Sequence, residues 1–315
     1  MNILVTGGGG FIGSHLVDLL LEHEHFVTVL DNFSTGKCSN LPQVHSQLQI
    51  IEGDIRNADT VSQAADDCDA IVHLAAVASV QASVDDPIGT HEVNLIGTVN
   101  LLEAAKQHSI KRFVFASSAA VYGNTEVMPV SETTSLSPLT PYAADKLASE
   151  YYIDFYRRQY GCLPAVFRFF NIFGSRQDPS SPYSGVISIF MQRAINNQPI
   201  TVFGDGEQSR DFVYVADLVQ LLADAVEKKN SHHLPMNVGN GSQTNLNQLL
   251  DLIREFSENK LDVSYVTARP GDIRHSLADN TFVRKIMSYQ PQYSVASGLK
   301  ITYDWYLTQN RKILN

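Results

Sequence analysis

Tyr142 and Lys146 lie four residues apart in the stretch YAADK, and this pair of residue types can move a proton. On a helix, the spacing places both side chains on one face, one turn apart. Free tyrosine has a pKa of about 10 and is a poor base at neutral pH, but a nearby ammonium group favours its phenolate form. A phenolate can take a proton from a sugar hydroxyl as hydride leaves the same carbon. The alternative is an exposed pair on an ordinary helix surface.

Two serine hydroxyl groups and an asparagine amide precede this pair in the sequence, at distances along the chain that fit within one domain. Ser117 and Ser118 end a predicted strand in FASSAAVYG, where a hydroxyl can hydrogen-bond the reacting oxygen of a substrate. Asn94 lies on the preceding predicted helix. Each residue alone also fits a simpler role, as a turn-forming serine or a helix-surface amide. Their occurrence together and in this order favours a catalytic site.

A glycine-rich turn near the start of the chain is typical of a dinucleotide site. Gly7, Gly10 and Gly13 stand in ILVTGGGGFIGSHL, directly after a predicted strand and at the opening of a helix. Gly7 suits a tight turn, Gly10 lets the backbone approach a pyrophosphate, and Gly13 lets the helix pack on the strand. The helix N-terminus supplies N–H donors to the phosphates. The alternative is a flexible glycine loop.

An acidic residue follows where a dinucleotide site needs one. Asp31 ends the second predicted strand, where a carboxylate accepts hydrogen bonds from an adenosine ribose and repels a 2′-phosphate. This favours NAD over NADP. Asp54 and Ile55 end the third predicted strand and could frame the adenine. Asp31 also fits an ordinary strand end, and Asp54 a helix cap.

Short apolar runs alternate with longer periodic segments in the first half of the chain. The runs predict buried parallel strands, at residues 2–5, 26–31, 48–54, 70–75, 112–118 and 164–171. The periodic segments predict helices, among them 14–23, 91–108 and 141–160. This alternation implies right-handed crossovers and an α/β fold with a Rossmann-type doubly wound parallel sheet. Ligands of such sheets bind at the carboxyl ends of the strands, where the residues above fall.

The alternation loosens after about residue 174. The segment 174–185, GSRQDPSSPYSG, is rich in Ser, Pro and Gly and predicts a loop or a boundary. We therefore expect an NAD-binding Rossmann domain over 1–174. A smaller, mixed α/β domain for the substrate should follow over 175–315, with the chain crossing back to the first domain.

Composition excludes several classes of protein and partner. The 315 residues are 44% apolar and 18% charged, enough to bury a sizeable core. The net charge is -10 without any Lys/Arg-rich stripe, so nucleic acids and anionic membranes are poor partners. No apolar run approaches a membrane span, and the N-terminus does not resemble a signal peptide. The three cysteines form no paired framework, so we expect reduced thiols in the cytoplasm.

Motifs along nearly the whole chain resemble the extended short-chain dehydrogenase/reductase superfamily, and within it the nucleotide-sugar 4-epimerases. The matching stretches are VTGGGGFIGSHL, LDNFSTGK, EGDIRN, HLAAVASV, VNLIGTVNLLEAA, SSAAVYG, YAADK, RFFNIFG, VFGDGEQSRDFVYVADLV and RPGDIRHSLAD. The resemblance implies a bound NAD and a UDP-sugar substrate. It also implies the mechanism: a tyrosine phenolate removes the C4 hydroxyl proton while hydride passes to NAD. The 4-keto sugar then turns over, and hydride returns to its other face.

The resemblance and the residues above together give a set of expected site residues. The catalytic residues are Ser118, Tyr142 and Lys146. The residues expected to meet NAD are Gly7, Gly10, Phe11, Ile12, Gly13, Asp31, Asn32, Asp54, Ile55, Leu74, Ala75, Ala76, Asn94, Tyr142 and Lys146. The residues expected to meet the UDP-sugar are Ser117, Ser118, Asn171, Val202, Phe203, Arg210, Arg269, Asp272 and Ser276.

Each substrate residue carries an implied task. Arg210 and Arg269 match the phosphate-binding arginines, a role that suits the bidentate guanidinium. Asn171 matches a residue that holds the diphosphate, and Asp272 the acid that meets the uridine ribose. The segment of Val202 and Phe203 borders uracil in the family.

Small differences within the family point to the sugar. The related dehydratases and decarboxylases carry acidic residues just after the strand-end hydroxyl, whereas Ala119 and Ala120 follow Ser118 here, which disfavours dehydration. Ala78 departs from the lysine of some galactose-type epimerases. Ser276 matches the position that borders the sugar's 2-substituent, and its small side chain leaves room for an N-acetyl group. We therefore expect UDP-GlcNAc/UDP-GalNAc interconversion, with UDP-Glc/UDP-Gal as a weaker activity.

Two other functions stay open at this stage. One is a UDP-glucuronate/UDP-galacturonate 4-epimerase or another NAD-dependent nucleotide-sugar-modifying enzyme. The other is a non-catalytic NAD-binding sensor, against which Tyr142 and Lys146 beside Ser118 argue. The resemblance also implies a homodimer through the helices at 91–108 and 141–160.

Overall fold

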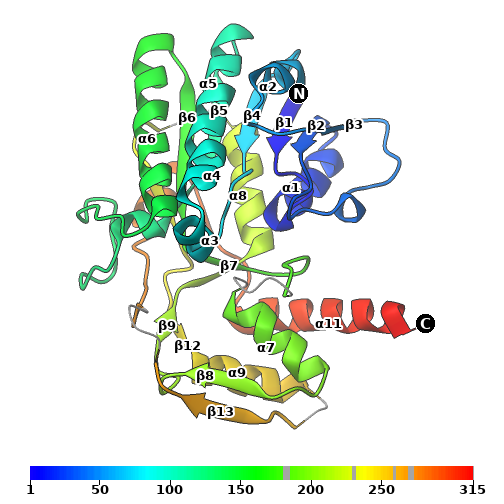
Figure 1. Ribbon diagram of the computed structural model, residues 1–315, viewed down its shortest axis with the longest axis vertical. Helices are drawn as coiled ribbons and strands as arrows, with labels where there is room; N and C mark the ends of the chain where they lie inside the picture. The colour runs from blue at the N-terminus through cyan, green and yellow to red at the C-terminus, as the bar shows by residue number, and fades with distance from the viewer. Residues whose placement is uncertain (180–184, 229–231, 258–259, 269–272, 315) are drawn as a thin grey trace.

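A seven-stranded parallel sheet forms the larger lobe of the computed structural model, which describes residues 1–179, 185–228, 232–257, 260–268 and 273–314 (Figure 1). Its strand order is β11-β6-β5-β4-β1-β2-β3. The strands in that order are Met236–Val238, Leu163–Phe169, Arg112–Ser118, Ala70–His73, Asn2–Thr6, Phe26–Asp31 and Leu48–Glu52. The order reverses at β1, so β1 and β4 flank the crevice in which such sheets bind their ligands.

Alternate residues of β1 pack against helices on opposite faces of the sheet. Ile3 and Val5 belong to a buried cluster with α1 (Phe11–Glu22) and α8 (Val215–Glu227). Leu4 belongs to a second cluster with helices of the other face, namely α2 (Ala58–Ala65), α5 (Gly97–Gln107) and α6 (Pro141–Tyr160). Both faces of the parallel sheet are therefore covered, as the near-continuous apolar strands require.

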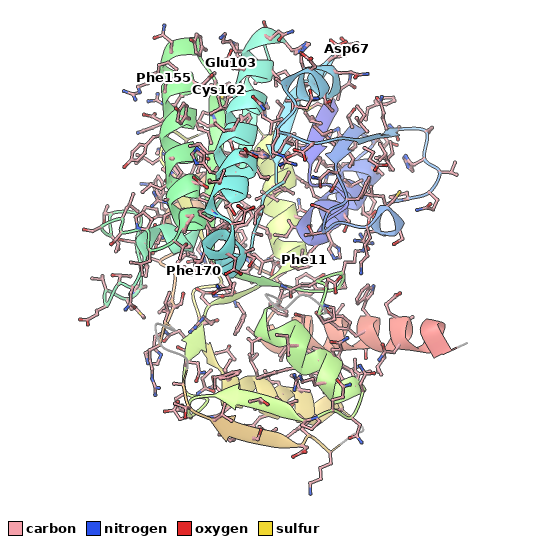
Figure 2. All side chains as sticks on the ribbon, viewed as in Figure 1. Phe11, Asp67, Glu103, Phe155, Cys162 and Phe170 are labelled. Carbon is pink, nitrogen blue, oxygen red and sulfur yellow. The ribbon has the colours of Figure 1, made fainter. Side chains whose placement is uncertain are left out.

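The segment 164–171, expected as one strand, divides in two. The large sheet keeps β6 up to Phe169, and β7 (Asn171–Phe173) pairs with β10 (Phe212–Tyr214) in a separate sheet. At the division, the N–H of Phe170 donates to the carbonyl of Val238. The chain therefore leaves the large sheet at Phe170, which Figure 2 places where the two lobes meet.

The segment 91–108, expected as one regular helix, is also interrupted. Helices α3 (Val80–Asp85) and α4 (Pro87–His91) come first, and a π-helical turn over Glu92–Ile96 joins α4 to α5. The widened turn contains Asn94, whose carbonyl accepts from the Thr98 hydroxyl at 2.6 Å. Such π turns are frequent at functional sites.

The smaller lobe lies below the sheet in Figure 1. It contains α7 (Val186–Ile195), α9 (Leu246–Phe256) and two short sheets. The sheets pair β8 (Ile200–Phe203) with β13 (Val263–Val266), and β9 (Ser209–Arg210) with β12 (Thr244–Asn245). Helix α11 (Val295–Leu314) extends beside α7 (Figure 1). Between these elements, α8 and β11 return to the larger lobe.

The remaining short elements are helical. They are the 3-10 turns Cys38–Asn40 and Ala119–Tyr122 and helix α10 (Thr281–Met287). Among the described residues, no helix is both long and apolar enough to cross a membrane.

Candidate active site

Close backbone approach explains the glycines at the end of β1. Gly7 has a φ of +70°, and a Cβ there would lie 2.8 Å from the backbone nitrogen of Ala75. A Cβ on Gly13 would lie 2.1 Å from the carbonyl oxygen of Gly7. Gly10 caps α1 without a side-chain hydrogen bond, so the first N–H groups of the helix have no side-chain partner there. An uncapped N-terminus behind a tight turn fits a pyrophosphate.

Asp31 is buried at the carboxyl end of β2 and is fixed against the glycine turn. Its Oδ2 accepts from the N–H of Gly9 at 2.8 Å, and its Oδ1 accepts from the N–H of Phe33 at 2.8 Å. Each oxygen keeps a second lone pair, so the carboxylate can still accept from ribose hydroxyls. This donor and acceptor set fits NAD.

A hydrogen-bonded group at the end of β3 extends this edge. The side-chain amide of Asn32 donates to Asp54 at 3.0 Å, and Arg56 donates to both oxygens of Asp54 at 3.0 and 2.8 Å. The hydrogen bond from Arg56 is the main reason that the pKa of Asp54 falls to about 2. Ile55 is buried behind this group. The sequence interpretation missed Arg56, although its place two residues after Asp54 was a signal for an Asp-Arg pair.

Asn94 fixes the chain segment that follows β4. Its Oδ1 accepts from the N–H of Val77 at 2.8 Å, and its Nδ2 donates to the carbonyl of Val77 at 3.1 Å. Leu74, Ala75 and Ala76 lie just before Val77, and Ala75 is the residue that approaches Gly7. The buried amide of Asn94 thus holds the backbone beside the glycine turn, a task that the sequence interpretation did not assign.

His73 supports this edge from inside the sheet. It is fully buried, and its ring nitrogens lie 2.8 Å from the Thr6 hydroxyl and 3.0 Å from the Thr98 hydroxyl. Burial, aided by Lys146, lowers the pKa of His73 well below its usual value, so the ring is neutral. Figure 2 shows Phe11, at the start of α1 beside Ile12, on the side of the larger lobe that faces the smaller one.

The structure brings Ser118, Tyr142 and Lys146 together at the ends of β5 and α6. Thr140 caps α6 by accepting from the N–H of Ala143, which fixes the first turn with Tyr142. The side chain of Ser118 lies close enough to the Tyr142 hydroxyl to influence its pKa. The Nζ of Lys146 donates to the carbonyl of Ala116 at 2.8 Å and lies 6.0 Å from the centre of the Tyr142 ring.

Burial shifts the pKa values of the two titratable groups in opposite directions, in each case toward the neutral form. It raises the pKa of Tyr142, while the nearby Ser118 side chain opposes the rise. It lowers the pKa of Lys146 to about 8, although the carboxylate of Asp145 opposes this shift. The phenol is therefore protonated at neutral pH in the chain alone, and its ionisation needs nearby positive charge. Lys146 is still mostly an ammonium at that pH and supplies part of this charge.

Ser117, expected at the substrate, instead meets a charged residue of α6. Its hydroxyl is buried and donates to Glu150 at 2.5 Å. Glu150 also accepts two hydrogen bonds from Arg168, at 2.9 and 2.6 Å, and Arg168 donates to Tyr122 at 2.9 Å. The structure therefore does not bring Ser117 together with Ser118 and Tyr142.

A cavity of about 730 Å³ lies in the smaller lobe. Four of the expected substrate residues line it: Asn171, Val202, Phe203 and Arg210. Further polar lining comes from Gln177, Gln192, Arg193 and Gln208, which the sequence interpretation missed. Both apolar and polar side chains thus face a space in the size range of small-molecule sites.

Ser276 and Arg210 meet at β9. The N–H of Ser276 donates to the carbonyl of Ser209 at 3.1 Å, and the guanidinium of Arg210 donates to the same carbonyl at 3.0 Å. Ser276 is half-buried. The other two expected substrate residues, Arg269 and Asp272, lie outside the described residues.

Residues 3–239 match the family model described as the NAD dependent epimerase/dehydratase family. The chain belongs to this family. A relative from Methanocaldococcus jannaschii, named a putative UDP-glucose 4-epimerase, is 37% identical over 313 residues, which are 98% of this chain and 99% of the relative. The match confirms the predicted family, its NAD dependence and its α/β fold.

Two similar solved structures carry informative names. A UDP-N-acetylglucosamine 4-epimerase from Methanobrevibacter ruminantium, in complex with UDP-N-acetylmuramic acid, is 39% identical with a TM-score of 0.93, and the match covers 98% of both chains. A UDP-glucose 4-epimerase from Thermotoga maritima with UDP-glucose is 36% identical with a TM-score of 0.93, over the whole of both chains.

Proposed function

We propose that this enzyme interconverts UDP-GlcNAc and UDP-GalNAc by inverting C4, with UDP-Glc and UDP-Gal as weaker substrates. The class of enzyme is established: the chain is an NAD-dependent UDP-sugar 4-epimerase, which is an isomerase. One observation carries the chemistry: Ser118, Tyr142 and Lys146 converge at the carboxyl ends of strands whose neighbours form the glycine turn.

The residues around the glycine turn would hold NAD. The N-terminus of α1, opened by Gly10, suits the pyrophosphate, and the fixed carboxylate of Asp31 suits the adenosine ribose. Asn32, Asp54 and Ile55 would border the adenine. Lys146 would hold the nicotinamide ribose. When bound, NAD supplies a hydride acceptor that is restored within each turnover.

The catalytic residues would handle the proton at the sugar's C4 oxygen. Tyr142 removes this proton as a phenolate and returns it at the end of the turnover. Ser118 donates a hydrogen bond to the same oxygen. The ammonium of Lys146 stabilises the phenolate electrostatically, at a buried position where charge interactions are strong.

The cavity of the smaller lobe would anchor UDP while the sugar turns. Arg210 suits the diphosphate because a guanidinium makes charge-assisted, bidentate hydrogen bonds to phosphate oxygens. Asn171 would join it there, and Val202 and Phe203 would border the uracil. Arg269 and Asp272 are proposed from sequence alone, as a second phosphate ligand and the uridine-ribose acid.

Ser276 supports the choice of an N-acetylated sugar. Its backbone N–H and the guanidinium of Arg210, the proposed diphosphate ligand, donate to the same carbonyl, that of Ser209. The small side chain of Ser276 therefore lies near Arg210. A short side chain at the sugar's 2-substituent leaves room for an acetamido group. The relative from Methanobrevibacter ruminantium, named a UDP-N-acetylglucosamine 4-epimerase, agrees with this choice.

Proton NMR of the anomeric region tests the proposal directly. Purified protein is mixed with UDP-GalNAc without added cofactor, and we expect UDP-GlcNAc signals to grow to a fixed ratio. Turnover of only UDP-Gal or only UDP-glucuronate would keep the mechanism and discard the choice of sugar. No turnover of any of the three would favour the NAD-binding sensor.

Ser276→Tyr tests the sugar choice separately from the chemistry. The bulky ring should abolish turnover of UDP-GalNAc and spare that of UDP-Gal. Ser276→Ala, which keeps the space, serves as the control and should retain both activities. Equal loss of both activities in the tyrosine variant would count against the pocket argument.

We also propose a cytoplasmic homodimer. Helix α6 exposes a row of aromatic side chains to solvent, with Tyr151 64%, Tyr152 44% and Phe155 45% exposed. Figure 2 places Phe155 on the outer side of the larger lobe. An exposed aromatic row of this kind marks an interaction surface. Sedimentation of the purified protein, compared with a Tyr151→Glu/Phe155→Glu variant, tests it.

A further inference from the structure

Three side chains with metal-ligating atoms converge at a place remote from the glycine turn and the cavity. His23, His25 and Glu227 each contribute one ligand atom, and these atoms all lie within 4.8 Å of one another. Nδ1 of His23 lies 2.6 Å from Oε1 of Glu227, and Nε2 of His25 lies 3.0 Å from the same oxygen. A single carboxylate oxygen is thus shared by two imidazole rings.

The backbone holds both histidines in place through the turn that ends α1. The N–H of His25 donates to the carbonyl of Leu20, and the N–H of Glu24 donates to that of Leu21. This pair of bonds is the Schellman pattern, and Glu24 occupies its left-handed position with a φ of 61°. Glycine is the usual residue there. The turn therefore presents His23 and His25 on the same side, with their rings 6.4 Å apart at 70°.

Glu227 is held from the other side as the last residue of α8. Helix α8 packs along α1 on the same face of the sheet (Figure 1). Arg112 of β5 donates to the carbonyls of Val226 and Lys228, the latter at 2.8 Å. The backbone on both sides of Glu227 is therefore anchored, and its carboxylate meets both histidines of the turn.

We propose that His23, His25 and Glu227 form a binding site for one divalent transition metal ion, best matched by Zn²⁺. Two imidazoles and one carboxylate are a ligand set that Zn²⁺ accepts, with nitrogen and oxygen distances of about 2.0–2.2 Å. Tetrahedral geometry at those lengths separates ligand atoms by roughly 3.3 Å. The present separations from Glu227 open to this value by small side-chain rotations.

The exposure of the cluster permits entry and a fourth ligand. The side chains of His23 and Glu227 are 34% and 26% exposed, and that of His25 is 14% exposed. Water can therefore complete the coordination, and an ion can reach the site from solvent. Imidazole and carboxylate ligands also accept Ni²⁺, Cu²⁺ and Co²⁺, which makes Co²⁺ a usable spectroscopic probe.

The position of the site assigns it a stabilising role. Helix α1 runs from the glycine turn to His23, and α8 runs from β10, whose Phe212 lines the cavity, to Glu227. A bound ion would join the far ends of these two helices. Binding to the folded chain alone raises its apparent stability. We therefore expect a higher midpoint of thermal unfolding with the ion, and no change in epimerisation.

The test uses full-length protein without an affinity tag, stripped with a chelator that is then removed. Co²⁺ is titrated while visible absorption is recorded, and Zn²⁺ binding is measured by calorimetry. The variants are His23→Ala, His25→Ala and Glu227→Gln. The matched control is His232→Ala/His233→Ala, which removes a stacked histidine pair outside the cluster. Circular dichroism and epimerase activity confirm that each variant is folded.

We expect one equivalent of Zn²⁺ per chain and Co²⁺ absorption bands typical of a tetrahedral site. Loss of one ligand should weaken binding by at least about tenfold, while the control binds as the wild type. The absence of Co²⁺ bands in the wild-type protein would overturn the proposal, whatever the variants do. So would Zn²⁺ binding that all three variants retain.

Discussion

Ser117 and Ser118 are neighbours in β5, and their hydroxyls meet two different residues of the same helix, Glu150 and Tyr142 of α6. The hydroxyl of Ser117 donates to the buried Glu150 at 2.5 Å, whereas the side chain of Ser118 lies near the Tyr142 hydroxyl and lowers its pKa. One serine therefore belongs to a buried ionic network and the other to the candidate catalytic group. Substitution of each in turn separates folding from chemistry.

Ser118→Ala should lower kcat by about 10²–10³, since it removes a hydrogen-bond donor from the reacting oxygen. Ser117→Ala should retain most of the activity and lower the free energy of unfolding by about 1–3 kcal/mol, because it removes a buried partner of Glu150. NMR turnover and urea unfolding measure the two effects. An equal loss of activity in both variants would contradict the division of roles.

Tyr142→Phe should lower kcat by about 10²–10⁴ because the variant cannot take or return the proton. The ring remains, so the midpoint of thermal unfolding and the amount of co-purified NAD should match the wild type. Both are measured on the same preparation as turnover. Full activity in this variant would remove Tyr142 from the mechanism.

Gly13→Ala and Gly10→Ala should fail in different ways. A Cβ on Gly13 meets the backbone of Gly7 at 2.1 Å, so this variant should lose at least about 1–3 kcal/mol of stability. A Cβ on Gly10 meets only the Gly7 carbonyl, at 3.1 Å, and the chain should fold. It should nevertheless retain less NAD, because the methyl group stands where the pyrophosphate approaches. Chromatography of nucleotide released by heat tests this, and wild-type NAD content in Gly10→Ala would argue against the assigned pyrophosphate position.

Lys146 should make stability rise with pH above about 8. Its pKa is about 8 in the folded chain and 10.5 unfolded, so between these values the unfolded chain binds more protons. The cost of burying the ammonium, fully present below pH 8, is relieved as the folded chain releases the proton. From pH 8 to 9.5 the contribution is up to about 2 kcal/mol.

Lys146→Met lacks this contribution and provides the reference. Urea unfolding of both proteins at pH 7.5, 8.5 and 9.5 gives the difference in unfolding free energy at each pH. The difference, wild type minus variant, should increase with pH. A constant difference would mean that the lysine keeps an ordinary pKa in the folded chain.

Local patterns were sufficient to predict most of the larger lobe. Apolar runs and helical periodicity located the parallel strands and the helix at 141–160. Strands buried between two layers of helices consist almost entirely of apolar residues, so they can be recognised from the sequence. The strand at 164–171 was mispredicted as continuous. Its apolar pattern does not end at Phe170, and the change of sheet depends on pairing with Phe212–Tyr214, about 40 residues later.

The candidate site was predictable where a motif carries the chemistry and unpredictable where a tertiary contact does. YAADK and the glycine turn identified residues that the fold brings to one edge of the sheet. The Glu150–Arg168 ion pair joins α6 to β6, and no short sequence motif predicts it. The task of Asn94 at Val77 depends likewise on a contact across 17 residues.

The described residues that line the cavity fall between 171 and 246, whereas the proposed catalytic residues all lie between 118 and 146. The described cavity lining and the proposed proton-transfer group thus occupy separate stretches of the sequence. A library that randomises cavity positions such as Thr201 and Gln208 would explore other nucleotide carriers without altering the proton-transfer group. The fold in this sense offers an engineering route to new sugar donors by substitutions that leave the proton-transfer group unchanged.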